Sequence, residues 1–111
     1  MDSFAILAYL SDEEGADKVE LLIENAEKGK IKLFMCYVNL GEVYYITARE
    51  FGTVKANEAI AIVKRLPIEF VEVDESLALT AGRIRAMHSL AYADAFVVAT
   101  ASQRLLTKRR P

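Results

Sequence analysis

The stretch "IKLFMCYVNLGEVYYITAREF", residues 31–51, changes its pattern part of the way along. Residues 31–38 are rich in side chains that favour β-structure, which predicts a strand. From Asn39 to Phe51 the apolar side chains recur at helical spacing, and the following Gly52 is typical of the residue that ends a helix. A strand that runs directly into a helix is the unit from which α/β folds are built.

The same alternation continues on both sides of this stretch. A second strand is predicted over "IEFVEV", residues 68–73, and a last helix, apolar on every side, over residues 93–102. Further helices are predicted at residues 3–10, 15–28, 55–66 and 74–87, with ends marked by Gly29, Pro67 and the N-cap Asp74. We therefore expect one α/β domain over residues 1–111, a three-layer α/β/α sandwich with a central parallel sheet.

Composition limits the classes of function. Apolar residues make up 53% of the 111 residues, and no apolar run reaches membrane-spanning length, so we expect a cytoplasmic protein without membrane contact. One cysteine and one histidine are too few for a zinc site of Cys and His ligands, so a bound metal would need oxygen ligands. The net charge of −2 gives no general attraction to nucleic acid.

Three acidic residues stand out near the expected functional ends of the sheet. Asp2 precedes the first helix, Glu42 lies in the helix after the first strand, and Asp94 interrupts the apolar segment "SLAYADAFVVATA", residues 89–101. A charge in apolar surroundings is costly unless something compensates it. Each also has an ordinary explanation: Asp2 as a helix cap, Glu42 as the ion-pair partner of Arg49, and Asp94 as a first-turn acid.

Taken together, the segments "DSFAILAYL", "NLGEVYY" and "YADAFVVATA" resemble the PIN-domain family, in particular its small VapC-like toxins. The resemblance implies a metal-dependent endoribonuclease whose catalytic carboxylates, Asp2, Glu42 and Asp94, also bind Mg²⁺ or Mn²⁺. Ser3 and Asn39 would be supporting polar residues. The resemblance further implies an RNA substrate, a homodimer, and a cognate antitoxin whose C-terminal segment covers the acidic groove.

The chemistry of these residues agrees with that assignment. Hard divalent ions prefer oxygen ligands, and carboxylates close together repel one another unless a cation neutralises them. A metal-activated water would cleave a phosphodiester without a His or Cys nucleophile. We interpret His88 as a helix-end residue and Cys36 as a buried thiol. We expect the tyrosines at positions 37, 44 and 45 to pack in the core rather than stack on bases.

The sequence departs from the family pattern at both ends. Only Met1 precedes Asp2 where members have a strand, and Arg109 falls where a fourth acid is expected. We therefore expect the first and last strands to be missing, with an open sheet edge and either poor stability of the monomer or strand exchange between subunits. Two other functions stay open: a catalytically degenerate module that binds antitoxin or dimerises, and a metal-free ligand-binding domain with widely separated acids.

Overall fold

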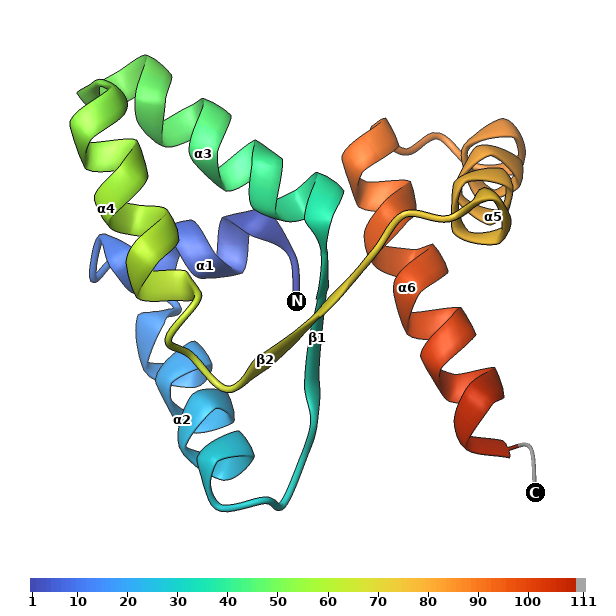
Figure 1. Cartoon of the computed structure of the whole chain (residues 1–111), viewed down its shortest axis with the longest axis horizontal. Helices are drawn as coiled ribbons and strands as arrows, with labels where there is room; N and C mark the ends of the chain where they lie inside the picture. The colour runs from blue at the N-terminus through green and yellow to red at the C-terminus, as the bar shows by residue number, and fades with distance from the viewer. Residues whose placement is uncertain (110–111) are drawn as a thin grey trace.

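A computed structural model of the chain describes residues 1–109, and their side chains as far as residue 104 (Figure 1). Helices and strands alternate along these residues as an α/β fold requires. The elements are α1 (Ser3–Leu10), α2 (Ala16–Glu27), β1 (Leu33–Cys36), α3 (Tyr37–Phe51), α4 (Thr53–Val63), β2 (Ile68–Val71), α5 (Glu75–Met87) and α6 (Tyr92–Arg109).

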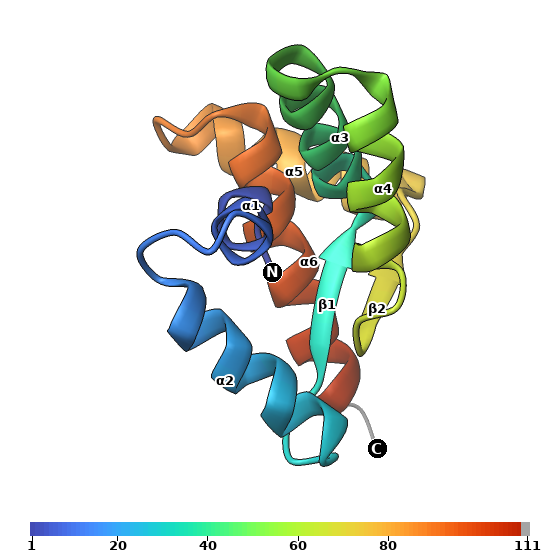
Figure 2. The ribbon, with the colours of Figure 1, turned by 90° about the vertical axis from the view of Figure 1, so that its left-hand side faces the viewer.

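The two strands form a parallel pair that separates two layers of helices. The register runs from Leu33 opposite Ile68 to Cys36 opposite Val71. Because side chains alternate between the faces of a strand, Met35 packs in one core with α1, α3 and α4, and Cys36 packs in another with α5 and α6. In Figure 1, α1 and α6 lie on opposite sides of β1, and Figure 2 shows β1 and β2 side by side. The predicted three-layer α/β/α architecture with a parallel sheet is confirmed.

Local signals in the sequence set several boundaries. Gly52 ends α3 with φ +91°, a conformation that glycine adopts without steric cost, and its N–H bonds to the carbonyl of Ala48. Asp74 caps α5, since its carboxylate accepts a hydrogen bond from the N–H of Leu77 at 2.8 Å. The predicted ends at Gly52 and Asp74 are therefore confirmed.

Other boundaries differ from the prediction. Both strands have four residues, and α3 begins at Tyr37, two residues before the predicted start. The last helix runs from Tyr92 to Arg109 and is not buried on every side, because Val98 is 44% exposed. Its buried face consists of Ala95, Phe96 and Ala99. Small residues on the other sides gave this helix its uniformly apolar pattern. No helix within the described residues is long and apolar enough to cross a membrane.

Candidate functional site

The first turn of α1 is joined to the second turn of α3 by a side-chain hydrogen bond. The Ser3 hydroxyl, almost fully buried at the start of α1, donates to the carboxylate of Glu42. Glu42 is half-buried. A carboxylate held by a buried hydroxyl has fewer accessible rotamers, so the Ser3 contact fixes where Glu42 presents its charge.

A second hydrogen bond joins α3 to the start of α6. The side-chain amide of Asn39 is 1% exposed and donates to the carbonyl of Ala93 at 3.0 Å. Asp94, the next residue, lies half-buried in the first turn of α6. Asn39 and Glu42 are three residues apart on α3 and so lie on one side of that helix. The carboxyl end of β1, which leads into α3, thus gathers the segments that carry all three predicted acids.

The structure supports the ordinary explanation for two of the three acids, Asp2 and Asp94, but not for Glu42. Asp2 is the N-cap of α1, with its carboxylate accepting from the N–H of Ala5 at 2.7 Å. Asp94 is a first-turn acid, where the helix dipole favours a negative charge. Glu42, however, does not pair with Arg49, because the Arg49 guanidinium bonds to the Tyr45 hydroxyl at 2.6 Å and lies over its ring.

The donor set matches a hard divalent ion in kind, but its arrangement does not form a metal centre. Mg²⁺ and Mn²⁺ take carboxylate oxygens, which Asp2, Glu42 and Asp94 offer. Among the residues whose side chains are described, no three His, Cys, Asp or Glu side chains gather into a group that could hold an ion. One oxygen of Asp2 is bonded to the backbone of α1, and one of Glu42 to Ser3. The role of the three acids as metal ligands stays a prediction.

Residues considered in the sequence and set aside occupy structural positions. Cys36 is a free thiol buried beside α5 and α6, and His88 ends α5 with its N–H on the carbonyl of Ile84. The tyrosines were predicted to pack in the core, and this is wrong: Tyr37, Tyr44 and Tyr45 are 42%, 36% and 55% exposed. The buried residues of α3 are instead Asn39, Leu40, Val43 and Thr47, on the other side of the helix. The side chain of Arg109, at the position where a fourth acid is expected, lies outside the described residues.

One polar atom at the site is without a partner. The side-chain carbonyl oxygen Oδ1 of Asn39 is buried and accepts no hydrogen bond within the described residues. Sequence reasoning placed Asn39 beside the acids but gave no sign of this unsatisfied oxygen. It also missed the Ser3–Glu42 bond, because that bond joins residues 39 positions apart in the chain.

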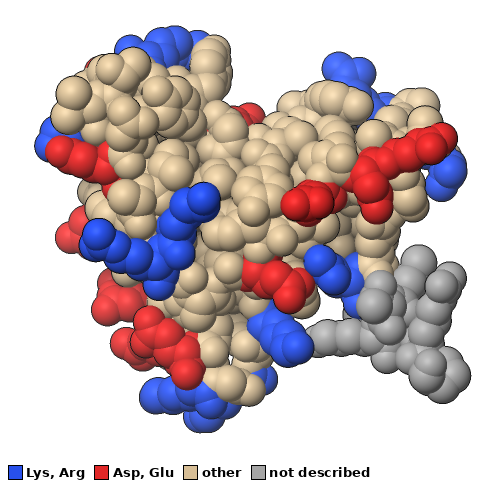
Figure 3. Space-filling view, in the orientation of Figure 1, with Lys and Arg blue, Asp and Glu red and all other residues tan. Residues whose placement is uncertain are grey.

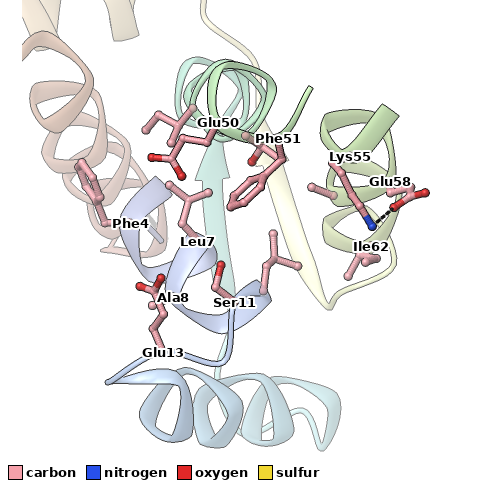
Figure 4. A pocket seen from close by; sticks show the side chains of 14 residues that line it. Phe4, Leu7, Ala8, Ser11, Glu13, Glu50, Phe51, Lys55, Glu58 and Ile62 are labelled. Atoms are coloured by element: carbon pink, nitrogen blue, oxygen red, sulfur yellow. Dashed lines mark ion pairs between the residues drawn. The ribbon is translucent and has the colours of Figure 1, made fainter. Parts of the chain in front are cut away.

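A cavity of about 490 Å³ lies between α1, α3 and α4 (Figure 4). Ile46, one turn after Glu42, is in its wall. Apolar side chains such as Phe4, Leu7 and Phe51 line it together with the carboxylates of Glu50 and Glu58, and Glu58 pairs with Lys55 at 3.6 Å. The lining of the cavity therefore combines apolar side chains with acidic groups.

Charge on the surface is mixed. On the face drawn in Figure 3, acidic and basic side chains alternate around a broad uncharged area and form no continuous basic stripe. This distribution agrees with the small net charge of −2. Any RNA contact on this face would rely on local groups rather than on a general positive field.

Comparison with known proteins identifies the family. No curated protein matches this chain. A family model described as the PIN domain matches residues 1–108, which is nearly the whole sequence. PIN domains are generally nucleases and typically use divalent metal ions. The three-layer fold, the acids near the carboxyl end of β1 and this match lead to one conclusion: the chain belongs to the PIN domain family.

Proposed function

We propose that the protein is a metal-dependent endoribonuclease of a toxin–antitoxin system. The observation that carries the proposal is the pair of hydrogen bonds from Ser3 to Glu42 and from Asn39 to Ala93, because they fix two predicted catalytic segments at one end of β1. Asp2, Glu42 and Asp94 are the proposed catalytic and metal-binding residues. The resemblance to VapC-like toxins and the match to a nuclease family support this reading.

In this proposal the chain's own residues position the reacting groups. Ser3 holds the Glu42 carboxylate, and Asn39 anchors the turn that carries Asp94. Clustered carboxylates repel a phosphodiester unless their charge is neutralised, which is why the proposal includes Mg²⁺ or Mn²⁺. It requires the three acidic side chains to turn toward a common point, away from the arrangement described above.

The test of activity is cleavage of single-stranded RNA by the purified chain with Mg²⁺ or Mn²⁺. We expect Glu42→Gln and Asp94→Asn to lower the cleavage rate by roughly 100-fold or more. Glu24→Gln, which changes an exposed carboxylate on α2, is the matched control and should cleave like the original. Equal activity in all four proteins would reveal a contaminating nuclease and contradict the proposal.

A calorimetric titration with Mn²⁺ tests the metal site separately from cleavage. We expect binding by the original chain, loss of binding in Asp94→Asn, and tighter binding in Arg109→Asp, which replaces a positive charge at the predicted fourth-acid position. Binding that is unchanged in Asp94→Asn would show that the ion lies elsewhere.

The proposed partners are an RNA substrate, a cognate antitoxin and a second copy of this chain, all in the cytoplasm. The cavity between α1, α3 and α4 supports an antitoxin segment as a partner, because an amphipathic basic segment would match its apolar and acidic walls. An arginine of such a segment would pair with Glu50, which lines the cavity.

The second candidate is a catalytically degenerate PIN protein that binds antitoxin or dimerises without cutting RNA. The lack of a three-residue metal group among the described side chains favours it. This candidate expects no cleavage and no Mn²⁺ binding by the folded original chain. It also expects Asp94→Asn to leave folding and partner binding unchanged.

A further inference from the structure

Three exposed tyrosines on α3 surround one glycine. Tyr37 lies four residues before Gly41, and Tyr44 and Tyr45 lie three and four residues after it, so all three are its neighbours on the helix surface. Gly41 is itself exposed, and a Cβ at this position would have open space around it. We call these four residues the tyrosine surface. It consists of exposed backbone bordered by aromatic rings.

Two of the rings are held by neighbouring side chains. The Tyr37 ring stacks on Phe70, with the ring centroids 5.5 Å apart. The Arg49 guanidinium lies 4.9 Å from the centroid of the Tyr45 ring and donates a hydrogen bond to its hydroxyl. These contacts restrict the rotamers of both tyrosines, so less side-chain entropy is lost when a ligand packs on them.

The tyrosine surface also carries a positive charge. Among the residues whose side chains the structure describes, Arg49 pairs with no carboxylate, and its contacts are with Tyr45. Its other N–H groups are available to an anionic group beside the Tyr45 ring. The tyrosine surface therefore suits a ligand that combines a flat aromatic ring with a negative charge, as a nucleotide does.

This surface adjoins the proposed catalytic carboxylate. Tyr45 follows Glu42 by three residues on α3, a spacing that places the two Cβ atoms about 5–6 Å apart. If a phosphodiester of RNA lies at Glu42, the bases next to that bond are within reach of the Tyr45 ring. An exposed aromatic surface at this place favours RNA over a protein partner, because it continues directly from the proposed site of cleavage.

We propose that the tyrosine surface binds unpaired bases of single-stranded RNA beside the proposed cleavage site, with Arg49 on a neighbouring phosphate. The choice of RNA as the ligand rests on the proposed function. Bases within a duplex are stacked on one another, so the tyrosine surface selects single-stranded RNA. Every base has a flat face, so stacking on Tyr45 tolerates different sequences.

Fluorescence anisotropy with a labelled oligouridine tests the proposal, in EDTA so that no metal-dependent cleavage occurs. The comparison is an abasic oligomer with the same ribose-phosphate backbone and length. The original chain should bind oligouridine about tenfold or more tighter than the abasic oligomer. Tyr45→Ala should lose most of this difference, and Tyr45→Phe, which keeps the ring, should retain it. Phe51→Ala removes another exposed aromatic side chain of α3 and is the matched control.

Two further variants test the glycine and the charge. Gly41→Leu should weaken oligouridine binding without lowering the melting temperature, because its side chain covers the exposed backbone and leucine favours a helix more than glycine does. Ala61→Leu, at an exposed position of α4, is its control. Arg49→Ala should reduce the slope of log Kd against log salt concentration by about one.

Several results would overturn the proposal. These are no binding of oligouridine by the original chain, equal binding of oligouridine and the abasic oligomer, or an undiminished difference in Tyr45→Ala. A dimer that Tyr45→Ala dissociates would show that a second copy covers the tyrosine surface, and would also reject the proposal.

RNA cleavage with Mn²⁺, measured on the same proteins, separates this inference from the proposed function. Cleavage without base-dependent binding refutes the role of the tyrosine surface and leaves the nuclease in place. Base-dependent binding without cleavage supports the tyrosine surface and contradicts the nuclease. A loss at Tyr45→Ala that appears in KM and not in kcat is the result expected when both are correct.

Discussion

The Ser3 hydroxyl donates a hydrogen bond to the Glu42 carboxylate and thereby joins the start of α1 to the second turn of α3. The two residues are 39 positions apart in the chain, and Ser3 is almost fully buried. This contact couples stability to function, because it holds the buried Ser3 side chain in place and at the same time orients Glu42, a candidate catalytic acid.

Removal of the Ser3 hydroxyl should therefore affect both properties. We expect Ser3→Ala to lower the free energy of unfolding in urea by about 1–2 kcal/mol, since a buried bond to a carboxylate is lost. RNA cleavage should fall as well if Glu42 is catalytic. Ser102→Ala, an exposed serine on α6, is the control and should change stability by less than about 0.5 kcal/mol. Equal stability of the two variants would contradict a structural role for the bond.

Substitutions at Asn39 should lower the stability of the fold more than Ser3→Ala does. Asn39→Ala removes the donor to the Ala93 carbonyl and leaves a small void, so we expect unfolding to become easier by about 1–3 kcal/mol. Asn39→Asp should be worse, because it places a charge in a buried position and removes the amide donor. Asn57→Ala, on the exposed side of α4, is the matched control. Urea unfolding of the three variants measures the difference, and a neutral Asn39→Ala would refute the anchoring role.

The cap of α5 makes a local prediction. Asp74→Ala should cost about 1 kcal/mol of stability, because the carboxylate that accepts from the N–H of Leu77 is removed. Asp74→Asn keeps an acceptor at the cap and should retain most of the stability. Chemical denaturation of both variants separates capping from a general effect of charge. A loss as large in Asp74→Asn as in Asp74→Ala would argue against the cap.

The N-terminus predicts a pH dependence. Burial lowers the pKa of the Met1 ammonium from its ordinary value of 8.0, although the charge of Asp2 acts in the opposite direction. Between the lowered pKa and 8.0 the unfolded chain binds more protons than the folded chain, so stability should rise with pH over this window. Urea unfolding measured below and above this window tests the sign. N-terminally acetylated protein should lose this part of the slope, and an unchanged slope would assign it to another group.

Much of the fold could be predicted from the sequence. Residues 3–10 were predicted as a helix and form α1, and the caps at Asp74 and Gly52 lie where local chemistry placed them. Signals of this kind are short-range: a side-chain oxygen reaches an N–H three residues on, and glycine alone tolerates the φ that ends α3. They require no knowledge of the rest of the chain.

The candidate site was predictable only in part. The sequence singled out Asp2, Glu42 and Asp94 with Ser3 and Asn39, but not how they interact. Apolar periodicity also failed for α6, where small residues hide the difference between its buried and exposed sides, and for Tyr44 and Tyr45 on α3.

The sequence by itself determined the order of the elements, the main helix ends and the residue types available for chemistry, because these depend on neighbours along the chain. Only the tertiary structure decided that Glu42 bonds to Ser3 rather than to Arg49, and that Asn39 anchors the turn before Asp94. The physical reason is that these contacts join residues 39 and 54 positions apart, and their formation depends on how two helical layers pack across a two-stranded sheet.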